Sequence, residues 1–253
     1  PVVSCDTPTK HKFGSSGTVL PRVDVKICDD QGNALPVGQK GEIVVRGENL
    51  MAGYWKNERA TRETIRDGWL FTGDIGYLDA DGFLFVLGRE KSVLIGHDGE
   101  KYSPEGIEET IVAHSPFIEQ VMLYNNQSAY TVGLIVPNKD AVLAYLKHHH
   151  LSCHADEGQT AALRLLQSEI DRYREGNKSA GMFPERWLPA AIAVLGEGFN
   201  EQNRLMNSTM KIVRGRISEF YKNRIDYALT PEGKDFCNYQ NKNIVKRFEE
   251  GKN

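Results

Sequence analysis

The chain has 253 residues, of which 40% are hydrophobic, and this is enough to bury a core larger than that of one average domain. Its 31 Lys and Arg residues nearly balance 34 Asp and Glu residues, and the net charge of -3 argues against nucleic-acid binding by charge alone. The four cysteines lie far apart without a C-x-x-C pair, which indicates neither a disulfide scaffold nor a cysteine-rich zinc site and favours reduced thiols in the cytoplasm.

The first part of the chain, residues 1–90, is predicted to be rich in β-structure. Short segments of alternating polarity indicate strands at residues 23–27, 41–47, 74–78 and 83–87. Residues 57–65 predict a short helix with Asn57 as its N-cap. Asp79 to Gly82 predicts the turn of a hairpin, because Asp and Gly tolerate the positive φ of tight turns.

The second part, residues 91–253, changes to alternating helices and strands and is predicted to be a separate domain. Ser103 is expected to cap, and Pro104 to begin, a helix that continues through His114. Further helices are predicted at residues 140–147, 159–174 and 210–221, and strands at 118–124, 130–136 and 191–195. Leu163, Leu166, Ile170 and Tyr173 share the face of their helix that is expected to be buried. The predicted fold class is therefore α+β.

Asp74 and Arg89 are the first candidate binding residues. The hairpin between them predicts that the two side chains lie on neighbouring strands. A carboxylate can accept hydrogen bonds from both hydroxyls of a ribose, and a guanidinium offers several donors to sugar or phosphate, so together they suit a nucleotide. The alternative is an ordinary surface ion pair, which spacing alone does not exclude.

Several motifs in succession closely resemble those of the adenylate-forming enzyme superfamily. They are Gly41–Ile43 leading into Gly53–Trp55, Thr72–Asp74 with Gly88–Arg89, Gly99–Glu105 leading into Ile107–Glu108, and Asn203–Lys211. The last resembles the catalytic-lysine motif of long-chain fatty acyl-CoA synthetases, in which a Thr and an apolar residue precede the Lys. The resemblance implies a distorted barrel-like β-subdomain of a large adenylation domain, followed by a small mobile α+β lid.

The resemblance also implies a function for individual residues. Asp74 would hold the ribose hydroxyls of ATP, Arg89 would contact the same nucleotide, and Lys211 would bridge the α-phosphate and the substrate carboxylate. Lys91 falls at the family's hinge between the two domains. The loop that contains Gly96, Gly99 and Lys101 would face coenzyme A, with glycines that let the backbone approach the pantetheine arm. Without the motif, Lys211 would be interpreted as an exposed lysine near the start of a helix.

The sequence departs from the family at two positions near the lysine. Arg204 stands where these synthetases usually have Gly, and Ser208 where many have Pro. The family's phosphate-binding loop and its Tyr-Gly-x-Thr-Glu segment are not found in these residues, and relatives carry the latter just upstream of the position of Pro1. Since the chain also starts with Pro rather than Met, we expect it to be a C-terminal fragment that is inactive by itself.

For the full-length protein the resemblance implies an acid–thiol ligase that uses ATP with Mg²⁺ and coenzyme A and produces acyl-CoA, AMP and pyrophosphate. The form of the lysine motif favours a medium- or long-chain fatty acid. Alternatives are an aromatic acid–CoA ligase, a peptide-synthetase adenylation domain, a luciferase-like oxidase, or a noncatalytic nucleotide-binding module. No carrier-protein segment follows Lys211, which weakens the peptide-synthetase interpretation.

Two remaining segments invite other interpretations. His148–His150 with Cys153 and His154 could suggest a metal site, but consecutive histidines do not converge from one helix, and a solvated helix end with no metal is favoured. Residues 242–247 predict a terminal amphipathic helix, for which a peripheral membrane contact is the less favoured alternative. No apolar run approaches the roughly 18 to 20 residues that span a bilayer.

Overall fold

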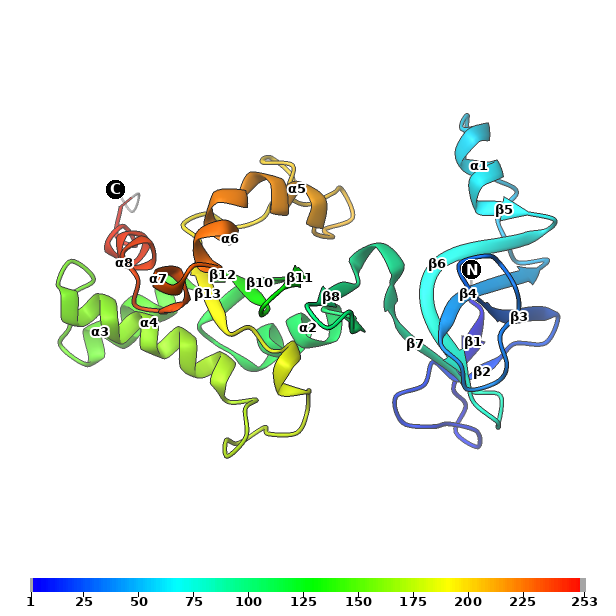
Figure 1. Ribbon diagram of the computed structural model, residues 1–253, viewed down its shortest axis with the longest axis horizontal. Coiled ribbons are helices and arrows are strands. Elements are labelled where there is room, and N and C mark those ends of the chain that lie inside the picture. Colours follow the sequence, from blue (N-terminus) through cyan, green and yellow to red (C-terminus); the bar gives the residue numbers. More distant parts are fainter. Residues whose placement is uncertain (1, 251–253) are drawn as a thin grey trace. The chain divides into compact units, whose positions relative to one another are not determined.

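A computed structural model describes residues 2–250 and shows the predicted α+β class (Figure 1). The chain forms two compact units, which divide between Val93 and Leu94. We call them the first unit and the second unit and describe each by itself. The division falls close to Lys91, which belongs to a 3-10 turn spanning Glu90–Ser92.

The first unit is built on an antiparallel sheet in which one long strand pairs with three others. The order is β3-β4-β6-β5, and β7 pairs with the remaining length of β6. The elements are β1 (Ser4–Cys5), β2 (Thr18–Val19), β3 (Val23–Cys28), β4 (Gly41–Gly47), α1 (Glu58–Thr64), β5 (Ile65–Arg66), β6 (Trp69–Leu78) and β7 (Leu84–Arg89). The predicted strands are confirmed, although β6 begins well before the expected position. Its ladders carry irregularities between Glu42 and Val44 and between Ile75 and Gly76, which bend the sheet.

Local side-chain hydrogen bonds fix the turns and the helix start of this unit. Asn57 caps α1 as predicted, since its side chain accepts a hydrogen bond from the Ala60 N–H at 3.1 Å. In the β6–β7 hairpin, Asp79 Oδ1 accepts from the Phe83 N–H at 2.9 Å, and Gly82 has a φ of +79°. The turn thus uses the left-handed backbone for which the sequence supplies a glycine.

The second unit places one sheet between two layers of helices. Its main strands are β10 (Ile118–Tyr124), β12 (Val132–Pro137) and β13 (Ala191–Val194), with β10 and β12 antiparallel and β12 and β13 parallel. A smaller sheet contains β8 (Leu94–Gly96), β9 (Lys101–Tyr102) and β11 (Asn126–Ser128). The helices are α2 (Glu105–His114), α3 (Lys139–His148), α4 (Asp156–Asp171), α5 (Arg214–Phe220), α6 (Lys222–Ala228), α7 (Pro231–Lys234) and α8 (Tyr239–Lys246), with a 3-10 turn at Glu185–Trp187.

Successive side chains along the strands of this sheet point to opposite faces, and each face contributes to its own hydrophobic core. Ile135 packs with residues of α2, α3, α4 and α8, whereas Leu134 packs with residues of α5 and α6. Because both faces are covered, the central strand β12 is apolar along its whole length. The four side chains predicted to share a buried helix face, Leu163, Leu166, Ile170 and Tyr173, are indeed buried.

Two predictions of helix starts were wrong. Ser103 does not cap α2, because its hydroxyl bonds the Glu105 carboxylate and Pro104 is the N-cap. The helix expected from Met210 begins only at Arg214, and Met210 has a positive φ of 60°. Lys211 therefore lies in a loop that precedes the helix rather than on the helix itself.

The C-terminal segment is an integral part of the second unit. Val245 and Phe248 are buried in the core that also contains α4, and this accounts for the apolar face of the predicted terminal helix. Asn241, fully buried, accepts from the Val194 N–H at 2.9 Å and donates to the Ile192 carbonyl at 3.0 Å. It thereby satisfies the free edge of β13. Among residues 2–250, none of the helices has the length and apolar character needed to cross a bilayer.

Candidate functional site

Asp74 and Arg89 lie opposite each other in the β6–β7 ladder, as predicted. Arg89 Nε is 3.1 Å from Asp74 Oδ1, and the exposed fractions of the two side chains are 63% and 33%. The pair is thus open to solvent, and the carboxylate retains acceptor capacity for a ligand. Such an exposed ion pair contributes little stability, so its geometry is available for binding.

The backbone around Asp74 is held by the side chain of Thr72 in β6 and by that of Glu42 in the neighbouring strand β4. Thr72 Oγ1 donates to the Ile43 carbonyl at 2.6 Å and accepts from the Asp74 N–H at 3.0 Å. Glu42 Oε1 accepts from the Gly73 N–H at 2.8 Å, and Gly73 has a φ of +69°. The Thr-Gly-Asp motif is therefore a fixed irregularity of β6, in which Thr and Gly are needed to aim the carboxylate.

Lys211 is exposed at the tip of a tight loop of the second unit. No acceptor for its ammonium is found among the described residues of the chain. The base of the loop is closed by an antiparallel bridge between Met206 and Ile212 and by a hydrogen bond from the Val213 N–H to the Leu205 carbonyl. The loop therefore presents a positive charge on a closed backbone ring.

Asn207 organises the interior of this loop. Its Oδ1 accepts from the Thr209 N–H at 3.0 Å, from Thr209 Oγ1 at 2.8 Å and from the Lys211 N–H at 3.0 Å. Its own N–H donates to the Lys211 carbonyl at 2.9 Å. The side chain satisfies backbone groups that a helix would otherwise have used, which explains why the helix starts later than predicted.

A buried ion pair missed by the sequence analysis stands next to this loop. Arg214, the first residue of α5, donates from Nη1 to Glu108 Oε1 at 2.9 Å, and its Nη2 bonds the other carboxylate oxygen. The exposed fractions of the two side chains are 15% and 8%. Burial raises the pKa of Glu108, and Arg214 together with the Leu123 N–H opposes that shift. The sequence contained one indication of this pair, because Glu108 lies among apolar residues on one face of its helix.

The segment expected to face coenzyme A is a short hairpin between β8 and β9. Gly99 has a φ of +80°, and its N–H donates to the Gly96 carbonyl at 3.0 Å. The turn thus requires a glycine at Gly99, whereas a Cβ at Gly96 would lie 2.8 Å from Asp98 Oδ1 and would displace that side chain. Lys101 is exposed on β9. The hairpin borders a cavity of about 160 Å³.

The residues that line this cavity include two aromatic rings and a charged pair. Tyr102 and Trp187 stack with ring centroids 5.2 Å apart. Trp187 Nε1 donates to Glu100 at 3.0 Å, and Arg186 Nη2 donates to the same carboxylate at 2.6 Å. Burial raises the pKa of Tyr102, whose hydroxyl bonds Thr131 at 2.5 Å. The hairpin is thus fastened to the 3-10 turn that contains Arg186 and Trp187.

Comparison with known proteins agrees with the motifs. The family model described as AMP-binding enzyme matches residues 1–55. The long-chain-fatty-acid–CoA ligase FadD15 of Mycobacterium tuberculosis is 31% identical over 221 residues, which are 87% of this chain and 35% of that protein. The chain belongs to the adenylate-forming enzyme superfamily.

Other members of the adenylate-forming superfamily are similar over shorter or more divergent stretches. The 2-succinylbenzoate–CoA ligase of Bacillus cytotoxicus is 47% identical over 108 residues, 43% of this chain and 22% of the relative. The structure of O-succinylbenzoate coenzyme A synthetase from Bacillus subtilis in complex with AMP matches with a TM-score of 0.56 and 26% identity, over 81% of this chain and 35% of that one. The chain spans about a third of the length of FadD15.

The candidate site residues fall into two groups, one in each unit. The structure brings Asp74 together with Arg89 in the first unit. In the second unit it places Lys211 on the Asn207 loop and places Gly96, Gly99 and Lys101 on the β8–β9 hairpin. Each group is therefore organised by its own local contacts.

The suspected metal cluster contains one residue that the sequence analysis did not consider. The ligand atoms of Cys153, His154 and Glu249 lie within 4.8 Å of one another, and His154 Nε2 is 3.0 Å from Glu249 Oε2. This mixture of thiol, imidazole and one carboxylate does not suit Mg²⁺, which prefers oxygen ligands. His148 to His150 lie at the end of α3, where His149 bonds the Tyr145 carbonyl. All four cysteines are free thiols.

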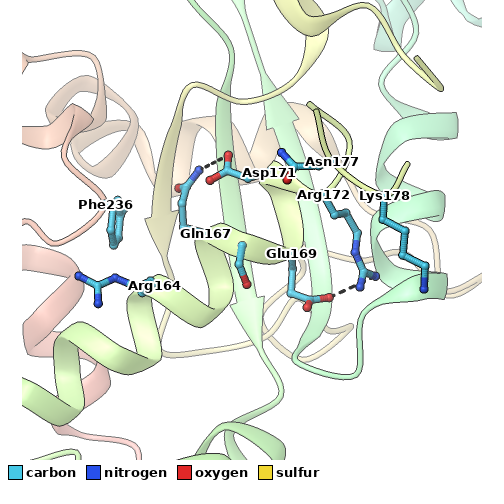
Figure 2. A pocket seen from close by; sticks show the side chains of 9 residues that line it. Arg164, Gln167, Glu169, Asp171, Arg172, Asn177, Lys178 and Phe236 are labelled. Carbon is cyan, nitrogen blue, oxygen red and sulfur yellow. Dashed lines mark hydrogen bonds and ion pairs between the residues drawn. The ribbon is translucent and has the colours of Figure 1, made fainter. Parts of the chain in front are cut away.

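A depression of about 490 Å³ on α4 carries charge but none of the candidate residues. Figure 2 shows Glu169 paired with Arg172 and the amide of Gln167 bonded to Asp171. Arg172 also donates to the His114 carbonyl at 2.6 Å. These contacts stabilise the outer face of α4, and the Glu169–Arg172 pair offers a useful comparison for the Glu108–Arg214 pair.

Proposed function

We propose that the chain supplies the ribose site, the catalytic lysine and the thiol-facing hairpin of an AMP-forming acyl-CoA ligase. The observation that carries the proposal is the exposed ammonium of Lys211 on a loop whose backbone is fixed by Asn207. The similarity to acid–CoA ligases named above supports the same activity for the full-length protein. Lys91 is proposed as the hinge between residues 1–90 and a mobile lid of residues 91–253.

In the first step of the proposed reaction, a carboxylate oxygen of the acid attacks the α-phosphorus of ATP. The new oxygen–phosphorus bond forms as the bond to pyrophosphate breaks, which yields the acyl-adenylate. Negative charge develops on the non-bridging oxygens of the α-phosphate in the transition state. The ammonium of Lys211 stabilises this charge more than it stabilises the ground state, so its main effect is on the rate.

In the second step, the thiol of coenzyme A attacks the acyl carbonyl and AMP leaves. The hairpin with Gly96, Gly99 and Lys101 is proposed to line the path of the thiol, because its glycines keep the backbone free of side chains. Lys101 adds a positive charge that suits the phosphates of coenzyme A.

The remaining residues hold the nucleotide. Asp74 is proposed to accept hydrogen bonds from the ribose hydroxyls, with Arg89 beside it as a donor. Mg²⁺ would screen the phosphates of ATP, and since the described residues offer no cluster of oxygen ligands for it, we assign it no ligand from this chain. The free cysteines support a cytoplasmic location, which is part of the proposal.

A long-chain fatty acid is the proposed substrate. The Thr209-Met210-Lys211 form of the motif and the similarity to FadD15 favour it. The second candidate is an aromatic acid, favoured by the 47% identity to a 2-succinylbenzoate–CoA ligase over 108 residues. A screen of both acid classes decides between them.

The test is acid-dependent pyrophosphate release by the full-length protein, with fatty and aromatic acids compared. Lys211→Ala is expected to lower the rate by about 100- to 1,000-fold with little change in ATP binding. Lys147→Ala, which removes an exposed lysine of α3, is the matched control and should keep the wild-type rate. If ATP binds but no acid drives release, a noncatalytic nucleotide-binding module becomes the better account. The isolated chain is expected to release no AMP.

A further inference from the structure

The buried pair of Glu108 and Arg214 connects two elements that carry proposed active-site loops. Arg214 follows Lys211 by three residues, and Glu108 belongs to α2, which directly follows the β8–β9 hairpin. The partners are 106 residues apart in sequence, so the ion pair is a long-range contact between the two regions.

The pair anchors the chain directly after the Lys211 loop, whereas Asn207 bonds groups inside the loop. The bridge between Met206 and Ile212 closes the loop, and both side chains pack against the apolar core that contains Leu134. Arg214 adds a polar anchor directly after the loop, because its guanidinium bonds both oxygens of Glu108, while Glu108 Oε1 also accepts from the Leu123 N–H of β10 at 2.6 Å. Three residues span at most about 10 Å, so Lys211 cannot move far while Arg214 is held.

Stability is a poor explanation for this pair. Removing two charges from water costs free energy that their attraction repays only in part, and apolar replacements of buried ion pairs are often equally stable. What a bidentate pair adds is a fixed direction, since a guanidinium and a carboxylate meet in one plane.

We propose that Glu108 is a positioning residue for Lys211. It acts through Arg214 to fix the loop against α2 and β10, so that the ammonium is in place for the adenylation step. The inference rests on the proposed function of Lys211. It assigns no contact with substrate to Glu108 or Arg214.

The test compares Glu108→Gln in the full-length protein with the double variant Glu108→Leu/Arg214→Met, which removes both charges and should fold. Adenylation is followed by acid-dependent exchange of pyrophosphate into ATP, and the second step by thioester formation from supplied acyl-adenylate. Both variants are expected to lose about tenfold to a hundredfold in kcat for adenylation, because a small misplacement of a catalytic group has such an effect. The KM for ATP and the rate of the second step should stay close to wild type.

The matched control is Glu169→Gln, which breaks the partly buried Glu169–Arg172 pair of α4 away from the loop (Figure 2). It should keep the adenylation rate. Wild-type adenylation by the double variant would overturn the proposal, since the pair would then serve folding only. An equal loss in both steps would overturn it as well.

A readout independent of activity separates this inference from the proposed function. Backbone hydrogen exchange of residues 207–213 should become faster in Glu108→Gln, while the buried strand β12 stays protected and Glu169→Gln leaves the loop unchanged. Unchanged exchange in the loop overturns the positioning inference even if Lys211 is catalytic. Faster exchange in a protein that releases no pyrophosphate with any acid supports the anchoring and overturns the catalytic function instead.

Discussion

The Asp74–Arg89 site and the Lys211 loop are held in place by different means. In the first unit, both residues are neighbours in a sheet ladder, and the two residues before Asp74 bond the adjacent strand, Thr72 at the Ile43 carbonyl and Gly73 at the Glu42 side chain. In the second unit, Lys211 lies outside regular structure, on a loop that is closed by the Met206–Ile212 bridge, organised by one amide side chain and followed by one buried ion pair. The proposed binding residue is thus fixed by the sheet, and the proposed catalytic residue by one bridge and a few side chains.

This difference indicates which substitutions should displace each site. A sheet distributes its restraint over many backbone hydrogen bonds, so changes that disturb the ladder are expected to displace Asp74 most. A loop is restrained by a few particular side chains, so the loss of one of them should change the loop conformation directly. The following variants of the full-length protein test this contrast.

Removing the carboxylate of Asp74 should have the largest effect. Asp74→Ala is expected to weaken ATP binding by about 10- to 100-fold, because a hydrogen bond to a charged group is worth about 1.5–3 kcal/mol. Titration calorimetry measures the change. Asp24→Ala is the control, since Asp24 forms an exposed pair with Arg46 in the same sheet. Equal weakening by both variants would contradict a specific site at Asp74.

Gly76→Ala should disturb the ladder that carries the first site. A Cβ at Gly76 would lie 2.3 Å from the Phe85 carbonyl oxygen, so β6 and β7 must separate locally. We expect the free energy of unfolding to fall by about 1–3 kcal/mol and ATP binding to weaken with it. Urea unfolding checks the first effect. Gly106→Ala, where a Cβ meets nothing within 4 Å, should not destabilise the protein.

Asn207→Ala should loosen the Lys211 loop without unfolding the second unit. Three hydrogen bonds to Oδ1 are lost, and we expect the adenylation rate to fall about tenfold. Asn207→Asp keeps an acceptor oxygen and should restore most of the rate. A similar loss in both variants would show that the amide does more than accept these bonds. Pyrophosphate exchange is the measurement.

The smallest predicted effect concerns the β6–β7 turn. The hydrogen bond from Lys12, at 2.5 Å, holds the pKa of Asp79 below its usual value. A lowered pKa in the folded state contributes stability above the unfolded pKa of about 4, and this contribution disappears as the pH falls through the folded value. Asp79→Asn should therefore lower the melting temperature at pH 7 but not at the acid end of the titration.

Regular elements with clear periodicity could be predicted from the sequence. The residues of β4 and β10 coincide with the expected strands, and the Asp74–Arg89 pairing follows from the hairpin between them. These features depend on residues that are close in the chain and on the spacing of apolar residues. Both can be read from a single sequence.

The environment of Lys211 could not be predicted in the same way. The apolar spacing of Val213 and Ile217 favoured a helix, but Asn207 competes for the backbone and Met210 adopts a positive φ. The Glu108–Arg214 contact joins residues too far apart for any local pattern to indicate. Sequence motifs thus indicated the candidate lysine, while the contacts around its loop became visible only in three dimensions.

The ion pair at the end of β7 means that the proposed ribose site already has one partner. Arg89 bonds one oxygen of the carboxylate that Asp74 is proposed to offer to a sugar, so a nucleotide bound there would share the carboxylate with the guanidinium. Arg89 is the last residue of its strand, and the chain leaves the first unit within the next few residues. A nucleotide at the proposed site would therefore contact a residue only a few positions before the two units are joined.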